Sequence, residues 1–208
     1  LILLFSFLFV MIFSVANAQT EVKIGSQTWM AVNLDVTTFR NGDIIPEAKT
    51  EQEWVLAKKN YSPAWCYYNN DKTNGSKYGR IYNEAAVKDE RGLAPKGWHI
   101  PSSDEWKQLI NYLGGNKLAG KKMKSTSGWD QNGNGNNSSH FNGLPGGHRN
   151  RNGTFFSIRG FANWYSLKIE SDEYTTYTFA SCISLSLFGD EANERAPEAG
   201  MYVRCIKD

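Results

Sequence analysis

Four oxygen-bearing side chains alternate along the segment 130–136 and could hold a cation. They are Asp130, Asn132, Asn134 and Asn136. The first three occupy positions one, three and five of a calcium-loop pattern, and Gly135 stands at position six, where such loops need glycine. Position twelve is Phe141 rather than a bidentate glutamate, and only one of the four candidate ligands is charged. The pattern predicts a weak calcium site, although asparagine–glycine sequence is also typical of plain turns.

Three histidines, His99, His140 and His148, are candidates for an iron or zinc site, because neutral imidazole is a common ligand of both metals. His99 precedes a predicted helix, whereas His140 and His148 lie near a later loop. Sequence spacing therefore does not bring the three rings together. The alternative for His99 is a core histidine held by hydrogen bonds.

A third set of residues has the chemistry of a sugar-binding surface. Aromatic rings pack against the C–H faces of sugars, while amide and guanidinium groups bind hydroxyls. The candidates are Trp129, Asn132, Asn134, His148, Arg149, Arg151, Trp164 and Tyr165. The alternative is structural, with the tryptophans in the core and Arg149 holding backbone carbonyls. We expect a ligand to contact the face formed by residues 128–153 and 163–165, because loops expose polar groups.

Two helices are predicted to support these loops, at residues 50–59 and 102–113. Each begins with a serine or threonine that is followed three residues later by glutamate, which is the pattern of a capping box. In the second helix, apolar residues recur at the spacing of one buried face: Trp106, Leu109, Ile110 and Leu113. We therefore expect the second helix to be scaffold rather than binding surface.

Short strands are predicted on both sides of the helices and the loop region. They lie at residues 21–33, 65–68, 80–82, 155–158, 163–169, 174–187 and 201–206. Strands, then helices, then a long polar loop and further strands are typical of an α+β domain with an antiparallel sheet. No repeat and no second core is evident, so residues 19–208 are predicted to form a single domain.

The net charge bears on the class of partner, and the composition of residues 1–18 bears on the expected location of the protein. The 208-residue chain has 23 basic and 21 acidic side chains, a net charge of +2, which disfavours nucleic-acid binding. Residues 1–18 are uncharged, mostly apolar and end in an A-x-A sequence, so we expect an N-terminally truncated signal peptide and an exported protein. No second apolar stretch reaches membrane-spanning length, and no membrane span is expected in the mature chain.

The three cysteines, Cys66, Cys182 and Cys205, show no C-x-x-C spacing, which disfavours a redox motif or a structural zinc site. An odd number of cysteines in an exported chain leaves one unpaired when a disulfide forms. We expect one disulfide and one buried thiol.

Several blocks of the sequence resemble a bacterial family, the Fibrobacter succinogenes major paralogous domain. The strongest is APKGWHIPSSDEW at residues 94–106, and VRCIKD closes the chain. Further blocks match in order, at residues 65–70, 78–83, 119–125, 128–129 and 141–149. The chain departs from the family pattern at Tyr165, where a second tryptophan is usual, and at His140 and His148.

The resemblance implies an exported domain of C-type-lectin-like architecture, related to the sulfatase-modifying-factor fold, with residues 22–24 paired to residues 201–206. It also implies a Cys66–Cys205 disulfide, since both cysteines lie in family-like blocks and Cys182 does not. Formylglycine-generating oxidases share this fold type, and only Cys182 with Cys205 could imitate their reactive pair.

The sequence contains no nucleophile elbow, P-loop or zinc-protease helix. We therefore expect a non-catalytic recognition domain without a cofactor, apart from weak calcium, that binds a glycan or an envelope or extracellular protein. The alternatives are a metal- or thiol-dependent oxidoreductase and a structural envelope protein.

Overall fold

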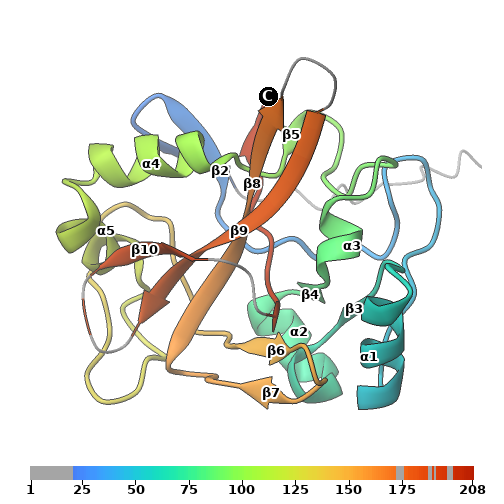
Figure 1. Cartoon of the computed structure of the whole chain (residues 1–208). Helices are drawn as coiled ribbons and strands as arrows, with labels where there is room; N and C mark the ends of the chain where they lie inside the picture. The colour runs from blue at the N-terminus through green and yellow to red at the C-terminus, as the bar shows by residue number, and fades with distance from the viewer. Residues whose placement is uncertain (1–20, 172–175, 187–188, 190, 196–198) are drawn as a thin grey trace, which may run out of the picture.

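The computed structural model describes residues 21–171, 176–186, 189, 191–195 and 199–208 (Figure 1). The predicted signal peptide lies outside these residues. The helices are α1 (Glu51–Lys59), α2 (Lys72–Tyr78), α3 (Glu84–Val87), α4 (Ser103–Tyr112) and α5 (Asn116–Met123), with a 3-10 turn η1 at Tyr68–Asn70. Both predicted helices are confirmed as α1 and α4, and both capping boxes are formed. Helix α5 was not predicted, because Gly120 and three lysines obscure its apolar face.

The described strands form four small sheets, where the sequence predicted one antiparallel sheet. The first has the order β1 (Glu21–Ile24), β2 (Gln27–Met30), β12 (Ile206–Lys207) and β5 (Trp98–His99). The others are β10 (Ala192–Arg195), β9 (Thr176–Ser186) and β8 (Phe161–Ser171); β11 (Ala199–Gly200), β6 (His148–Asn150) and β7 (Phe155–Phe156); and β3 (Trp65–Cys66) with β4 (Ile81–Tyr82). All pairs of named strands are antiparallel, so the mixed α and β content is confirmed.

The two ends of the described chain meet in the first sheet, but not through the strands that were predicted to pair. Ile206 in β12 lies opposite Trp29 in β2 and, on its other side, opposite β5. The predicted pairing of residues 22–24 with residues 201–206 is therefore wrong by one strand. The reason is local. β1 and β2 form a tight hairpin around Gly25, whose φ is 62°. β12 pairs with the other edge of β2, so β2 lies between β1 and β12.

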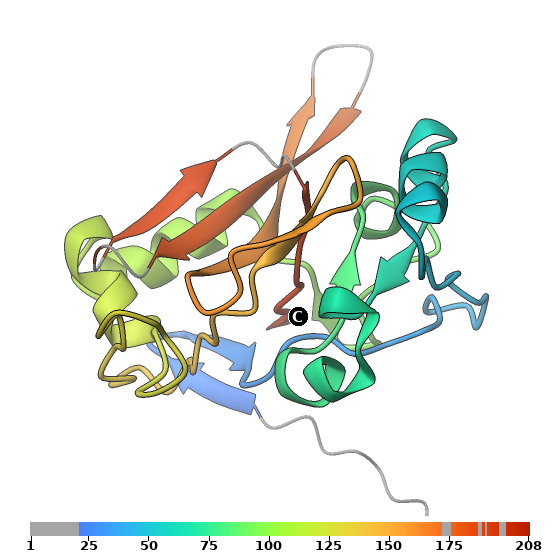
Figure 2. The same ribbon diagram turned by 90° about the horizontal axis from the view of Figure 1, so that it is seen from below.

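The largest buried side chains are aromatic and contact one another at the centre of the molecule. The ring centroids of Trp29 and Trp106 are 4.6 Å apart, and those of Phe141 and Trp164 are 5.3 Å apart. Helix α4 contributes its predicted face, since Trp106, Leu109, Ile110 and Leu113 are all buried. Figures 1 and 2 show α4 and α5 on one side of the molecule and α1 and α3 on the other, with the β8–β9 ribbon between them.

Three basic side chains are buried in this fold: Lys124, Arg149 and Arg204. Arg149 donates hydrogen bonds to the carbonyl oxygens of Gly153 (2.9 Å), Ala48 (2.7 Å) and Thr50 (2.8 Å). In the described part of the chain, no carboxylate lies within ion-pair distance of Arg149 or Arg204. Carbonyl groups therefore satisfy the donors of Arg149, as the structural alternative predicted.

The predicted disulfide between Cys66 and Cys205 is wrong, because both are free, buried thiols. They belong to different hydrophobic clusters: the cluster of Cys66 includes Trp54 and Trp106, and the cluster of Cys205 includes Met30. Burial raises the pKa of each thiol to about 12. Neither is therefore an activated nucleophile at neutral pH. The side chain of Cys182 lies outside what the structure describes.

His99 joins β5 to α4 and to the last residue of the described chain. Its Nδ1 lies 2.8 Å from Asp208 Oδ1, and its Nε2 lies 2.7 Å from Glu105 Oε1. Burial lowers the pKa of His99, but the hydrogen bonds to Asp208 and Glu105 outweigh burial, and the pKa is raised above 6.5. The imidazolium therefore stabilises the fold at low pH.

Replacing His99 with glutamine is expected to destabilise the protein more near pH 5.5 than near pH 8.5. A raised pKa contributes stability that is complete below the unfolded-state pKa of about 6.5 and is lost as the pH rises through the folded-state pKa. Urea unfolding of wild type and variant at about those two pH values measures the difference. An equal loss at both would show that the ion pairs contribute nothing.

Candidate functional site

The structure buries four of the predicted sugar-binding residues: Trp129, Arg149, Trp164 and Tyr165, none more than 4 % exposed. The indole N–H of Trp129 donates to Ser125 Oγ (3.1 Å) and to the Gly143 carbonyl (3.2 Å). The indole N–H of Trp164 donates to Asn33 Oδ1 (2.7 Å). Internal partners thus satisfy these polar groups, and the expectation that Trp129, Arg149 and Trp164 form an exposed binding face is wrong.

The predicted calcium ligands are engaged in a turn. Acceptor oxygens of Asp130, Asn134 and Asn136 receive hydrogen bonds from the Arg159 guanidinium (2.7 Å), the Trp129 amide (3.1 Å) and the Ser138 amide (3.1 Å). Asn132 is exposed and left-handed, with a φ of 61°. These contacts favour the turn interpretation over a cation site.

The three histidines are not brought together. His148 contacts Asn150 and Asn163, while His99 is held by carboxylates and His140 is exposed. Within the described residues, no three histidine, cysteine, aspartate or glutamate side chains are grouped to hold a metal ion. The geometry therefore does not support the three-histidine site.

A groove, here called the α1–α3 groove, is lined by residues of α1, of α3 and of the segments that follow them. The two helices lie on the same side of the molecule (Figure 1). The groove has two compartments that share Tyr61, Glu84 and Ala85. The α1 compartment has a volume of about 530 Å³, and its lining includes Val55, Lys58, Lys59, Asn83 and Arg151. The α3 compartment has about 510 Å³, and its lining includes Lys88, Asp89, Glu90 and Arg91. Each volume suits a small ligand or one unit of a longer one.

A narrow pit of about 50 Å³ adjoins the α1 compartment. Lys58, Asn83, Glu84 and Arg151 line both spaces, and the lining of the pit also includes Trp54, Tyr165 and Gly200. Gly200 cannot carry a side chain here, because a Cβ would lie 2.3 Å from the Trp54 ring. The structure thus brings two of the predicted binding residues, Arg151 and Tyr165, to one place.

Tyr61 stands at the boundary of the two compartments and is 86 % exposed. It immediately follows the C-cap of α1. Its N–H donates to the Lys58 carbonyl (3.1 Å), and the next N–H, of Ser62, donates to the Ala57 carbonyl (2.8 Å). These bonds form a Schellman motif in which Tyr61 takes the left-handed position that glycine usually occupies, with a φ of 50°. A tyrosine there is strained by about 1–2 kcal/mol.

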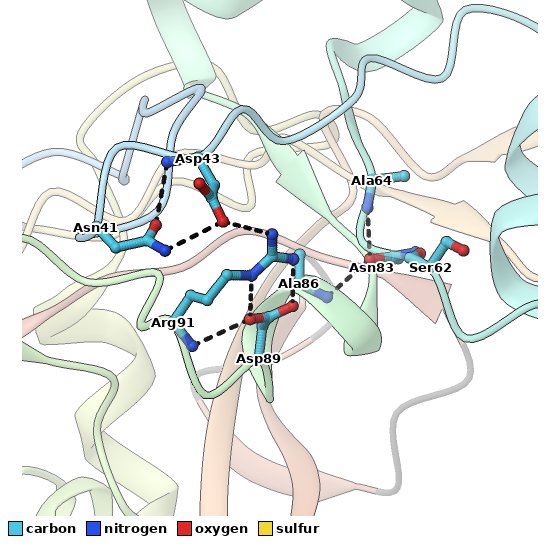
Figure 3. A network of polar contacts seen from close by, with 8 residues as sticks. All are labelled: Asn41, Asp43, Ser62, Ala64, Asn83, Ala86, Asp89 and Arg91. Atoms are coloured by element: carbon cyan, nitrogen blue, oxygen red, sulfur yellow. Dashed lines mark hydrogen bonds and ion pairs between the residues drawn. The ribbon is translucent and has the colours of Figure 1, made fainter.

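Asn83 fixes the two sides of the groove to each other (Figure 3). It is the N-cap of α3, and its Oδ1 accepts from the Ala86 amide (3.0 Å). The same oxygen accepts from the Ala64 amide (2.9 Å), and Nδ2 donates to the Ser62 carbonyl (2.8 Å). Because Ser62 follows Tyr61, this clamp also holds the backbone next to the exposed ring.

Arg91 fixes the outer rim of the α3 compartment (Figure 3). Its guanidinium donates two hydrogen bonds to Asp89, each 2.8 Å, and one to Asp43 (3.0 Å). The hydrogen bonds from Arg91 lower the pKa of both carboxyls. The cation also lies over the Phe39 ring, 4.2 Å from its centroid. These charges are engaged with one another, which leaves the α3 compartment without an excess of positive charge.

The groove was missed by sequence reasoning, apart from Arg151 and Tyr165. Lys58 and Lys59 look like ordinary basic residues at a helix end. Tyr61 belongs to no periodic pattern. The one available signal was an aromatic residue at the point where a capped helix must stop.

Comparisons with known proteins agree with the resemblance of the sequence blocks. The family model described as Fibrobacter succinogenes major domain matches residues 22–207. No curated protein and no solved structure matches the chain. Among the helices of the described residues, none has the length and hydropathy to cross a membrane.

Proposed function

The chain belongs to the Fibrobacter succinogenes major domain family, and we propose that it is a non-catalytic recognition domain that binds a carbohydrate chain in the α1–α3 groove. The observation that carries the proposal is Tyr61, an exposed ring held in a strained backbone position between two cavities. Strained residues persist where the surrounding structure holds them and cluster at binding sites.

A carbohydrate chain suits this arrangement better than a compact ligand. The two compartments share one exposed aromatic ring in their linings, so a chain could place one unit in each and pass over the ring. The flat face of tyrosine can pack against the C–H surface of a sugar, and the charged groups at the walls can bind its hydroxyls. The rigid clamps of Asn83 and Arg91 reduce the entropy lost on binding.

The proposal extends to the setting of the domain. We propose that it is exported, because residues 1–18 have the composition of a signal peptide. We also propose a C-type-lectin-like scaffold, on the strength of the sequence resemblance and the small antiparallel sheets. The binding surface differs from the sequence-based expectation, since it lies between α1 and α3.

Replacing Tyr61 with glycine is expected to weaken carbohydrate binding about tenfold, equivalent to about 1.4 kcal/mol. The same change is expected to leave stability unchanged or to raise it by about 1 kcal/mol, because glycine adopts left-handed backbone without strain. Electrophoresis through gels that contain soluble polysaccharides measures binding as retardation, and urea unfolding measures stability.

Tyr112→Ala is the matched control, since Tyr112 is a 65 % exposed tyrosine on α4, on the other side of the molecule. It should be retarded like wild type. If a broad panel of neutral and acidic polysaccharides retards no wild-type protein, or if Tyr61→Gly is retarded equally, the proposed function is wrong.

A further inference from the structure

We propose that a pocket at the C-terminal end of α2, here called the α2 pocket, binds a small organic carboxylate at the guanidinium of Arg204. The pocket has a volume of about 200 Å³, and besides Arg204 its lining comes from the segments 31–35, 75–79 and 142–144. None of its lining residues lines the α1–α3 groove. The inference therefore stands apart from the proposed function.

Arg204 brings to this pocket a positive charge that no carboxylate of the described residues neutralises. The residue is 1 % exposed, and its guanidinium has no ion-pair partner there. Burying a charge is costly unless an opposite charge or several hydrogen bonds compensate it. The side chain of Asn33 and two backbone carbonyls supply hydrogen bonds but no negative charge. An anion in the α2 pocket would supply that charge.

The guanidinium also has a donor to offer. Its Nε–H and one Nη2–H donate to Asn33 Oδ1 (3.0 and 2.7 Å), and Nη1 donates to the carbonyls of Phe141 (2.7 Å) and Met30 (3.3 Å). Four of the five N–H groups are thus engaged, and among the described residues the second Nη2–H has no acceptor. The guanidinium is the part of Arg204 at the pocket, because its partner Asn33 lines the pocket and its partner Phe141 precedes Asn142, which lines it too.

A second cation, Lys77, lines the same pocket from the last turn of α2. Its ammonium lies over the Tyr78 ring, 4.9 Å from the centroid, and forms no ion pair with the described residues. The lining includes one carboxylate, that of Asp35, which is paired with Arg80 outside the lining. The α2 pocket therefore has an excess of positive charge, which attracts an anion.

The size and the donors of the α2 pocket favour a short monocarboxylate. The volume lies below the range of about 300–1,000 Å³ that is typical of sites for larger ligands. One guanidinium N–H and one ammonium match the two oxygens of a single carboxylate. A dianion would bring a second negative charge toward Asp35, whereas Val32 and Leu144 offer apolar surface to a short alkyl group.

The test is a nuclear magnetic resonance titration of the whole 15N-labelled protein at constant ionic strength. The probes are acetate, propionate and lactate, each paired with its uncharged amide: acetamide, propionamide and lactamide. The reporters are the Nε–H resonance of Arg204 and the backbone amides of Asn33 and Asn142. We expect at least one carboxylate to shift all three resonances saturably, with a dissociation constant on the order of 1 mM, and its amide to bind at least about tenfold more weakly.

Lys77→Gln should weaken binding of that carboxylate about two- to fivefold, the effect of one exposed charge. Lys72→Gln is the matched control, since Lys72 is an exposed lysine of the same helix that does not line the pocket. It should leave the dissociation constant unchanged. Both substitutions are at exposed positions and keep the fold intact. Variants of Arg204 are unsuitable here, because losing its internal hydrogen bonds weakens the core.

The inference is wrong if no carboxylate shifts the Nε–H resonance of Arg204 saturably, or if the amides bind as tightly as the carboxylates. Tighter binding of phosphate or sulfate than of every carboxylate would replace the monocarboxylate by a dianion and would also reject it. Equal weakening in Lys77→Gln and Lys72→Gln would place the anion outside the α2 pocket. Tyr61→Gly should bind the carboxylate like wild type, so this result and that for carbohydrate binding can fail separately.

Discussion

Replacing Arg204 with methionine is expected to lower the free energy of unfolding by about 2–5 kcal/mol. The guanidinium is 1 % exposed, and its Nη1 donates to the carbonyls of Phe141 (2.7 Å) and Met30 (3.3 Å). Its Nε and Nη2 donate to Asn33 Oδ1 at 3.0 and 2.7 Å. Methionine fills the space but leaves two buried carbonyls without donors, at about 1–3 kcal/mol each. Denaturant unfolding measures the loss.

The size of this effect depends on the guanidinium remaining charged in the core. Burial lowers the pKa of Arg204 to about 9, which still leaves it protonated at neutral pH. The faces of Phe141 and Trp164 lie 4.6 and 5.7 Å from its Cζ and add cation–π stabilisation.

Arg159→Met is the matched control, because Arg159 forms an exposed ion pair with Asp130. Its loss should be below about 1 kcal/mol. Arg204→Lys retains a charge but not the fork of donors, so it should also destabilise. A loss below about 1 kcal/mol in Arg204→Met would mean that water or the relaxed backbone satisfies the carbonyls.

Replacing Trp106 with alanine is expected to destabilise the protein by about 3–5 kcal/mol, the range for a fully buried tryptophan. Trp106 is inaccessible to solvent and contacts three aromatic rings, those of Trp29, Phe141 and Trp164, at centroid distances of 4.6, 5.8 and 6.2 Å. Removing it leaves a cavity that these large rings cannot refill without changing their own contacts. Thermal and urea unfolding should both report the loss.

Lys107→Ala tests whether the effect belongs to the buried face of α4 or to the helix as such. Lys107 follows Trp106 but is exposed, with a 3.2 Å ion pair to Asp104. Its replacement should change stability by less than about 0.5 kcal/mol. Similar losses in both variants would contradict the assignment of Trp106 to the centre of the core.

Local sequence determined the parts of the fold that were predicted correctly. The capping boxes of α1 and α4 each require only four consecutive residues, and both are present as expected. The pairing of β12 depends instead on which strand edge the β1–β2 hairpin leaves available. That is a property of the assembled sheet, and no pattern in residues 201–206 reveals it.

The candidate site was harder to predict, because both a protein core and a binding surface are rich in aromatic residues. The sequence around an aromatic residue does not tell which of the two it belongs to. Trp129 and Trp164 lie near polar loop sequence, yet their indole N–H groups have internal partners. Tyr61 lies outside any loop-rich segment, yet its ring is exposed. The difference is set by tertiary contacts such as the Asn83 clamp, which joins residues distant in sequence.

The position of β12 between β2 and β5 has a consequence for the order in which the protein can fold during synthesis. Residues 27–30 leave the ribosome early, but their partner, Ile206, lies about 180 residues later in the chain. Until then β2 and β5 each present an unpaired edge, which is a site for wrong association. A nascent chain halted before residue 203 therefore cannot close its first sheet, and the domain completes folding only after translation of nearly its whole length.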